Sequence, residues 1–383
     1  MKGKLSKKIL FCDNTLWGLV NFRSYIFTHL RNLGYQVVLV APQDEKSVMQ
    51  SDIPEGMVYR AVRLKRCAQN VWDDFRYFCE LYQIYKDEHP DLIFHYTIKP
   101  NVYGTFASRL LGIPCINMMA GLGYAFQDNG ILNRCILYLY RFAMNRAWKV
   151  ICLNEENKKI ILKNRFCQEQ SLVLLKGGEG VDLQMFHNSG NTTFEEAGDV
   201  VFLMVARLLV DKGYRVLVDA VRLLKQQGIQ GFRCCVLGPI DVSYPTHVPL
   251  EELQADQAEG MIEYWGVVNR VQDILSMPNI VMVLPSFYPE GLNRSLMEAC
   301  AMGKPIITTD IPGCRETVDH GKNGFLVPPC DAQSLARAMA DFLCLSLAEK
   351  RKFSFHSRKK AENTFDIKHV LAEYVRMLGE QGL

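Results

Sequence analysis

Short apolar runs alternate with longer stretches of helical period along almost the whole of this 383-residue chain. The runs 9–12, 37–40 and 91–95 have the length of buried strands, and helix-period stretches such as 22–33 and 104–111 lie between such runs. Strands that alternate with helices pair in parallel through right-handed crossovers. The chain is therefore predicted to be an α/β protein built on parallel sheets.

The alternation stops in a turn-rich segment and then restarts. This segment, residues 176–198, is rich in Gly, Asn, Ser and Thr, the residue types that mark loops. We expect one α/β unit over 1–180, a second over 181–365, and a C-terminal helix within 366–383 that packs back on the first unit. Ligands of open parallel sheets bind beyond the carboxyl ends of the strands. Two such units therefore predict a ligand site in a cleft between them.

Composition excludes several classes of protein. The apolar fraction is 49% and the charged fraction 22%, as in ordinary globular proteins. No apolar run reaches the roughly 18–20 residues that cross a bilayer. The 13 cysteines include no Cys-x-x-Cys pair, so neither zinc spacing nor a redox motif is present. We expect a cytoplasmic protein with free thiols, since the first residues lack the long apolar region of a signal peptide.

Charge is unevenly distributed along the chain. Residues 1–180 hold 24 Lys and Arg against 16 Asp and Glu, whereas residues 181–383 hold 20 against 25. A basic first half fits an anionic partner such as phosphate or a lipid surface, or it reflects an uneven scatter of solvated charges. The stretch 132–149 interleaves cations with aromatic residues, which suits docking on an anionic membrane. A core helix whose cations face water would have the same composition.

The strongest local signal is the segment 284–307, where an apolar run leads through a proline-containing turn into a helix. Glu290 lies in the turn, and Glu298 follows eight residues later, about two helical turns on. The residues predicted to offer unpaired main-chain N–H groups at the helix start, an anion site, are Gly291, Leu292 and Asn293. Two carboxylates at this spacing suit the paired hydroxyls of ribose and of hexoses. As isolated residues they would be ordinary surface glutamates.

A second signal places two cations beside a helix start. Arg207 follows the apolar run 200–206, and Lys212 precedes Gly213 and the next helix-period stretch. Two cations at the carboxyl end of a strand fit a diphosphate. The alternative is a structural arginine and an ordinary lysine at a helix start.

Together these segments resemble glycosyltransferase family 4, the retaining enzymes of GT-B fold, over essentially the whole chain. Glu290 and Glu298 match the family's E-x7-E pair, and Arg207 with Lys212 matches its diphosphate clamp. Further matching positions are Gly180-Val181-Asp182 with Phe186, Gly313 with Glu316, Asn323-Gly324, and Ala299 with Gly303-Lys304-Pro305. The resemblance implies two Rossmann-like α/β/α domains that face each other across a cleft.

The resemblance also implies roles for these residues. Arg207 and Lys212 would hold the donor diphosphate, Glu298 the nucleotide ribose, and Glu290 would face the transferred sugar. Glu290, Arg207 and Lys212 are thus the expected catalytic residues. No Asp-x-Asp pair occurs, so we expect the diphosphate to be held without a metal ion or other cofactor, with the two cations stabilising the leaving group.

Two segments of the first half, 97–104 and 121–126, resemble bacterial members that extend sugars on a polyprenyl-diphosphate carrier in capsule, O-antigen or glycan assembly. The residues expected at the acceptor or cleft are Gly18, His95, Lys99, Gly121 and Gly123. Each has a plainer interpretation: a satisfied histidine, a surface loop cation, or a glycine that makes a tight turn.

We therefore expect a cytoplasmic enzyme, peripheral on the inner membrane. It would move a hexose or N-acetylhexosamine from a nucleotide sugar, a UDP-sugar, to a lipid-diphosphate-linked saccharide. One alternative is a nucleotide-sugar epimerase or hydrolase on the same scaffold. Another is a non-catalytic partner that anchors a second transferase, which would be expected to lack the Arg-Lys-Glu set. The chain has no dinucleotide-binding or P-loop glycine motif and no nucleic-acid-binding module.

Overall fold

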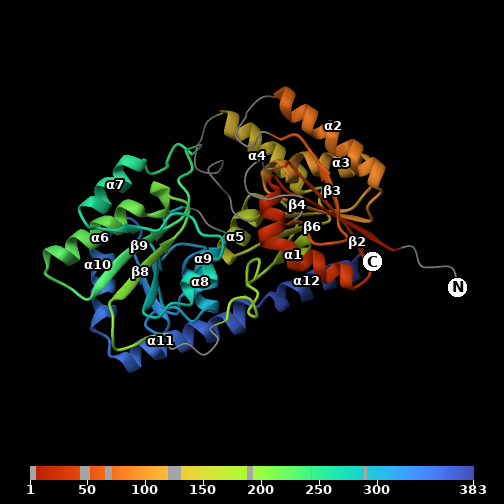
Figure 1. Cartoon of the computed structure of the whole chain (residues 1–383). Coiled ribbons are helices and arrows are strands. Elements are labelled where there is room, and N and C mark those ends of the chain that lie inside the picture. The colour runs from red at the N-terminus through yellow and green to blue at the C-terminus, as the bar shows by residue number, and fades with distance from the viewer. Residues whose placement is uncertain are drawn as a thin grey trace. The chain divides into compact units, whose positions relative to one another are not determined.

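The computed structural model of the chain describes residues 6–43, 52–64, 71–119, 131–187, 193–242, 244–288 and 291–383, with the backbone alone over 131–136 (Figure 1). These residues form two compact units. Unit 1 comprises Met1–Glu179 together with Val370–Leu383, and unit 2 is Gly180–His369. Each unit is a parallel sheet with helices packed on it, as the alternating pattern predicts.

Unit 1 contains a seven-stranded sheet of order β3-β2-β1-β4-β5-β6-β7, in which every pair is parallel. Its strands are β1 (Lys8–Cys12), β2 (Gln36–Ala41), β3 (Val58–Ala61), β4 (Leu92–Tyr96), β5 (Cys115–Met119), β6 (Lys149–Cys152) and β7 (Leu172–Leu174). Its helices are α1 (Leu16–Asn32), α2 (Val71–Glu88), α3 (Thr105–Leu110), α4 (Ile131–Met144), α5 (Glu155–Lys163) and most of α12 (Ile367–Glu380), with a π-helical turn at Pro100–Gly104.

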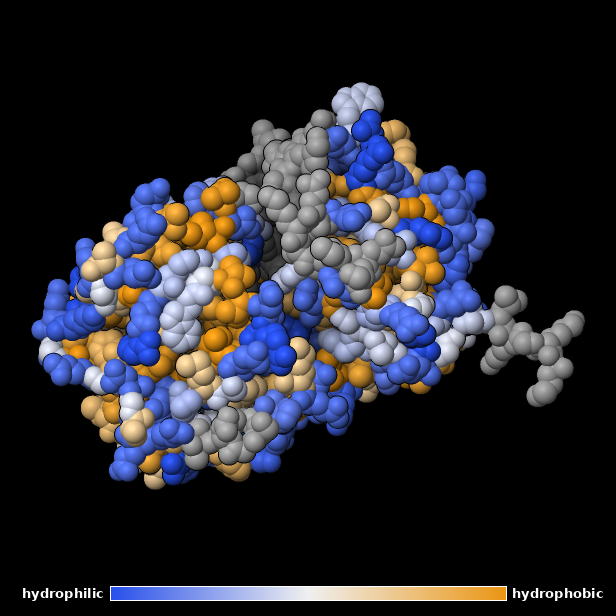
Figure 2. Space-filling model, viewed as in Figure 1, coloured by the Kyte–Doolittle hydropathy of each residue, from blue (hydrophilic) through white to orange (hydrophobic). Residues whose placement is uncertain are grey.

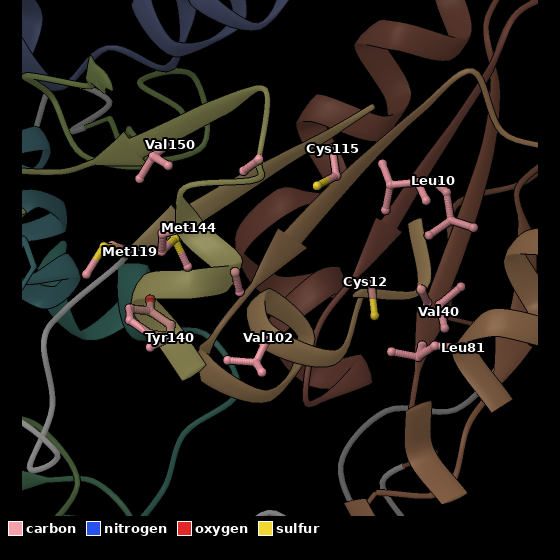
Figure 3. Packing of buried hydrophobic residues seen from close by; sticks show 14 of the residues in the cluster. Leu10, Cys12, Val40, Leu81, Val102, Cys115, Met119, Tyr140, Met144 and Val150 are labelled. Carbon is pink, nitrogen blue, oxygen red and sulfur yellow. The ribbon is translucent and has the colours of Figure 1, made fainter. Parts of the chain in front are cut away.

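One face of this sheet packs on α2, α3 and α4. Successive side chains of a strand point to opposite faces, so Leu10 and Cys12 of β1 join the cluster on this face. Figure 3 shows Cys12 beside Val40 of β2 and Leu81 of α2. Because both faces of the strands are covered, they are continuous apolar runs, which is why the sequence pattern locates them.

The opposite face packs on α1 and α12. Phe11 lies 4.6 Å from Phe27 of α1, measured between ring centroids, and 5.0 Å from Phe94. Phe94 in turn stacks on Tyr374 of α12 at 4.9 Å, and the Tyr374 hydroxyl is 2.8 Å from that of Tyr96. These aromatic contacts explain why the last 14 residues belong to unit 1 although they follow unit 2 in sequence.

Unit 2 contains a six-stranded parallel sheet of order β10-β9-β8-β11-β12-β13. Its strands are β8 (Val200–Val205), β9 (Phe232–Leu237), β10 (Glu263–Tyr264), β11 (Ile280–Leu284), β12 (Ile306–Thr309) and β13 (Gly324–Val327). Its helices are α6 (Tyr214–Gln226), α7 (Leu250–Ala258), α8 (Val271–Leu275), α9 (Arg294–Ala301), α10 (Ala332–Cys344) and α11 (Leu347–Lys360). Helices α6 and α10 lie side by side on the sheet (Figure 1).

Several elements differ from the sequence prediction. Helix α1 begins at Leu16, six residues before the expected start, because the Thr15 side chain accepts from the Gly18 N–H and caps it. Strand β3 and helices α7 and α11 were not predicted. The described residues include no helix long and apolar enough to cross a membrane. On the face shown in Figure 2, the coloured residues of both units mix hydrophobic and hydrophilic patches.

Candidate functional site

The carboxyl edge of the unit 2 sheet has a point where the chain reverses its direction of travel across the strands. From β8 the chain moves outward to β9 and β10, then crosses back to β11 on the other side of β8. Adjacent loops diverge at such a point, and ligands of doubly wound sheets bind there. The loops that flank it follow β8 and β11, and they carry Arg207, Lys212 and the segment before α9.

Arg207 leaves the end of β8 against an aromatic ring. Its guanidinium carbon lies 4.4 Å from the ring centroid of Tyr244, and its NH1 is 3.8 Å from an oxygen of Asp241. The side chain remains 38% exposed. A guanidinium supported on one side by a ring and open on the other is available to a diphosphate.

Lys212 lies in the same loop, directly before the glycine that starts α6. It is largely buried, and its ammonium is 4.9 Å from the ring of Tyr288. Gly213 has φ +87°, and a Cβ there would lie 2.1 Å from the carbonyl oxygen of Pro285. Only glycine permits this close approach, so the β8 loop packs directly on the loop that follows β11.

Main-chain hydrogen bonds join the same two loops. The N–H groups of Phe287 and Tyr288 donate to the carbonyl oxygen of Asp211 at 2.9 and 3.1 Å. The Thr308 hydroxyl donates to the carbonyl of Leu284 at 2.6 Å, which fixes the end of β11 against β12. The donor-site candidates on the two loops are therefore held by backbone contacts rather than by side chains alone.

Glu298 lies on α9 with 13% of its side chain exposed. Burial raises the pKa of its carboxyl, and the neighbouring Arg294 guanidinium opposes that shift. The Arg294 Nε donates to Glu298 Oε1 at 2.8 Å. Glu298 is thus a largely buried carboxylate with a cationic partner, and not the solvated surface residue of the plainer interpretation.

The loop before α9 corrects one expectation. The main-chain N–H of Asn293 donates to the carbonyl of Gly313 at 2.9 Å, so it is not one of the unpaired amides predicted there. The Asn293 side chain instead caps α9 by accepting from the Leu296 N–H. Gly291 and Leu292 are buried beside it, and Glu290 lies outside the described residues. In the part of the chain that the structure describes, no group of three His, Cys, Asp or Glu side chains could hold a metal ion.

Unit 1 has its own reversal point, between β1 and β4. Three of the five residues expected at the acceptor, Gly18, His95 and Lys99, lie near it. Gly18 is in the first turn of α1, with its α-carbon facing the Asp13 and Thr15 side chains. His95 is fully buried: its Nδ1 lies 2.9 Å from Asn117 Oδ1 and its Nε2 lies 3.0 Å from the Tyr85 hydroxyl. Burial lowers its pKa to about 4, so the ring is neutral. The other two, Gly121 and Gly123, lie outside the described residues.

Lys99 follows β4 and lies at the wall of a cavity. Its ammonium is 2.8 Å from Asp74 Oδ1, and the Tyr103 hydroxyl donates to the other Asp74 oxygen at 2.8 Å. The cavity, about 900 Å³, lies between the ends of β2 and β3 and helix α2, and Arg63, Arg76 and Glu80 also line it. Lys99 is therefore an ion-paired residue at the wall of this cavity rather than an isolated loop cation.

Two family models match the chain. The model for glycosyl transferases group 1 matches residues 191–360, and a glycosyl transferase 4-like model matches residues 8–154. The chain belongs to the group 1, family 4-like glycosyltransferases. The first match lies in unit 2 and contains Arg207, Lys212 and Glu298, while the second lies in unit 1 and contains His95 and Lys99.

The similar proteins include two bacterial transferases whose names specify a sugar linked to undecaprenol through a diphosphate. The N,N'-diacetylbacillosaminyl-diphospho-undecaprenol alpha-1,3-N-acetylgalactosaminyltransferase of Campylobacter jejuni is 25% identical over 87% of this chain and 88% of its own. The UDP-Gal:alpha-D-GlcNAc-diphosphoundecaprenol alpha-1,3-galactosyltransferase of Escherichia coli is 26% identical over 77% of this chain and 76% of its own. The crystal structure of Anabaena HepE in complex with UDP superposes with a TM-score of 0.79 at 18% identity, covering 97% of this chain and all of that one. The glycosyltransferase therefore has the GT-B fold.

Three residues beside the donor-site candidates of this glycosyltransferase escaped the sequence analysis. Tyr244 and Tyr288 support the two cations, and no local pattern marks them because each lies in a separate loop. Arg294 had a readable signal, since an arginine four residues before a glutamate on a helix faces it.

Proposed function

We propose that this glycosyltransferase moves a hexose or N-acetylhexosamine from a UDP-sugar to a polyprenyl-diphosphate-linked saccharide, with retention of configuration. The donor would bind on unit 2 and the acceptor on unit 1. The names of the two bacterial relatives support the lipid-linked acceptor, and the UDP complex of a structural neighbour supports the donor base.

One observation carries the donor half of the proposal. The exposed Arg207 and the buried Lys212 follow β8, and Glu298 follows β11, so cations and a carboxylate flank the reversal point of one sheet. A nucleotide sugar presents a dianionic diphosphate and a ribose diol. Each charge-assisted hydrogen bond to the diphosphate would contribute about 1.5–3 kcal/mol.

The chemistry follows from the same groups. As the bond between the anomeric carbon and the UDP oxygen breaks, negative charge grows on the departing phosphate, and Arg207 and Lys212 stabilise it. The acceptor hydroxyl attacks from the same face, and its proton passes to the departing phosphate oxygen. Glu290 would face the transferred sugar. A bound metal ion is not needed for this step.

Features of unit 1 support the acceptor half. The cavity beside Lys99 is lined by cations and carboxylates, among them Arg63, Arg76 and Glu80, groups that bind phosphates or saccharide hydroxyls. Helix α4 exposes Tyr138 and Phe142 next to Arg141 and Arg146, and the sequence 131–149 contains no Asp or Glu. Such a face suits an anionic membrane, where a lipid-linked acceptor resides.

The proposal is tested with purified enzyme, a panel of UDP- and GDP-sugars, and a short-chain lipid-diphosphate saccharide as acceptor. We expect a UDP-sugar to serve as donor, and we expect its transfer to continue in the presence of a chelator. The rate of transfer should fall by more than about 100-fold in Arg207→Ala or Glu298→Ala. The control is Arg270→Ala, which removes an exposed arginine of unit 2. Near-normal turnover in the site variants would refute the donor assignment. Isomerised or free sugar from the donor alone would indicate an epimerase or hydrolase instead.

A further inference from the structure

Arg294 lies one helical turn before Glu298, and among the described residues it donates to two oxygens. Its Nε donates to Glu298 Oε1 at 2.8 Å, and its NH1 donates to the carbonyl of Gly180 at 3.4 Å. We propose that Arg294 is the positioning residue of the donor site: it holds Glu298 as an oriented anion and ties it to the main chain where unit 2 begins. This inference rests on the proposed role of Glu298 in binding the donor ribose.

The first step of the argument concerns ionisation. A carboxyl with 13% of its side chain exposed loses hydration, and burial favours its protonated form. A carboxylate accepts from two ribose hydroxyls, whereas a protonated carboxyl has to use one oxygen as a donor. The charged group that the described residues bring to Glu298 is Arg294, and it opposes the effect of burial.

The second step concerns which oxygen is used. Arg294 engages Oε1 through Nε alone, in a side-on contact. Within the described part of the chain no donor reaches Oε2 of Glu298. The arrangement therefore leaves one carboxylate oxygen for a ligand hydroxyl while the other is held in place.

The third step concerns what Arg294 itself is held against. Gly180 has φ +71°, and the next residue, Val181, donates its N–H to the Phe365 carbonyl at 2.7 Å. Val181 in turn accepts from the Ile367 N–H at 3.1 Å. The Gly180 carbonyl is thus fixed by a short bridge between two distant segments of unit 2. An arginine can contact that carbonyl and Glu298 together through different nitrogens, which a lysine, with its single point charge, does less well.

The test is calorimetric titration of UDP into Glu298→Gln, Arg294→Met and Arg294→Lys between pH 6 and 8. The matched control is Arg376→Met, which removes an exposed arginine paired with Glu380 at the same helical spacing. We expect Arg294→Met to bind UDP about tenfold more weakly at pH 7 than the unchanged enzyme. The affinity of Arg294→Met for UDP, compared with that of the unchanged enzyme at the same pH, should recover as the pH rises. Without its cation, Glu298 ionises only at a higher pH. The double variant with Glu298→Gln should be no weaker than Glu298→Gln alone.

The outcomes separate the two claims. If Glu298→Gln binds UDP normally, the donor assignment fails and the inference with it. If Glu298→Gln loses affinity while Arg294→Met keeps both the affinity and the pH profile of the unchanged enzyme, the inference alone is wrong. Should Arg294→Met fail to fold, Arg294→Lys decides: it should keep the pH profile and lose affinity severalfold, and unchanged affinity would overturn the positioning role.

Discussion

Arg23 and Asp13 form a buried ion pair at the carboxyl edge of the unit 1 sheet. The two side chains are 4% and 3% exposed, and NH1 lies 2.8 Å from Asp13 Oδ2. The same guanidinium pairs with Glu179, stacks 3.7 Å above the Tyr96 ring and donates to the Gly18 carbonyl at 3.2 Å. One side chain thus joins the loop after β1, the end of β4 and the last residue of unit 1 before unit 2.

Arg23→Met should destabilise unit 1 by about 3–5 kcal/mol, because it leaves the Asp13 carboxylate buried without its cation. Urea unfolding followed by a unit 1 probe measures the effect. The control is Arg60→Met: the Arg60 side chain is 52% exposed, and its partner Glu88 keeps the Lys8 ammonium at 2.9 Å. This variant should lose less than about 1 kcal/mol. Equal losses in the two variants would contradict the buried-pair interpretation.

His95 predicts a pH dependence of stability. Its pKa is about 4 in the folded protein against an ordinary value of 6.5, because burial disfavours the charged ring. Below pH 6.5 the unfolded chain therefore binds a proton at His95 that the folded chain does not bind. The contribution of the neutral ring to the free energy of unfolding is present above pH 6.5 and is lost as the pH falls toward 4. The slope approaches about 1.4 kcal/mol per pH unit.

The measurement compares the unfolding free energy of the unchanged protein and His95→Gln from pH 7 to pH 5. Gln cannot take up the proton, so the difference between the two proteins should narrow as pH falls. Other acids titrate in both and cancel. Parallel curves over this range would show that His95 is not the group responsible.

Much of the fold is readable from the sequence because both sheets are covered on both faces. Buried strands such as β1 and β11 are unbroken apolar runs, and the predicted ranges fall within a residue or two of the observed ones. Strand β3 was missed because it is a half-exposed edge strand. Helix α11 was missed because its sequence is charged on nearly all sides and buries few side chains, among them Phe353, Ser354 and Ser357. Its capping box, Ser346 with Glu349, was the available signal.

The site was readable where chemistry follows a strand directly. Arg207 and Glu298 lie in local patterns, so their neighbourhood could be predicted. The partners of Arg23 could not, since Asp13, Tyr96 and Glu179 are brought together by the sheet from three distant segments. The sequence places Arg294 one helical turn before Glu298, so this pair could be predicted. What the sequence does not show is that the Glu298 carboxyl is largely buried, which is what makes the pair important.

Gly213→Ala should weaken UDP binding more than a glycine replacement that strains the backbone but meets no neighbouring atoms. A Cβ at Gly213 meets the Pro285 carbonyl oxygen at 2.1 Å, whereas one at Gly228, also at positive φ, meets nothing within 4 Å. Gly228→Ala should cost about 1 kcal/mol of stability from backbone strain and leave UDP affinity unchanged. Gly213→Ala should in addition weaken UDP binding, as titration calorimetry would show. Equal UDP affinity in both would mean that the contact between the loops after β8 and β11 does not shape the site.

Helix α4 yields a prediction about membrane binding. Its buried side holds Tyr140, whose ring packs on Phe166, while Tyr138 is 69% and Phe142 36% exposed. Arg146 lies over the Phe142 ring at 3.2 Å. Lys149, one of the cations expected to contribute, is instead paired with Glu380 at 3.1 Å. The exposed side of α4 thus combines two aromatic rings with Arg141, and Arg146 of the turn that follows the helix lies over one of these rings.

We expect the enzyme to sediment with vesicles that contain phosphatidylglycerol and to stay in solution with purely zwitterionic ones, more so at low salt. Each arginine near the surface contributes about 1 kcal/mol to attraction, so Arg141→Glu, which also reverses the charge, should reduce binding by more than tenfold. Lys163→Glu on α5 reverses an exposed charge of the same unit and should have little effect. If both variants reduce binding equally, net charge rather than the α4 face governs it. If neither does, α4 is a core helix whose cations simply face water, and the proposed lipid-linked acceptor would have to be reached by another surface.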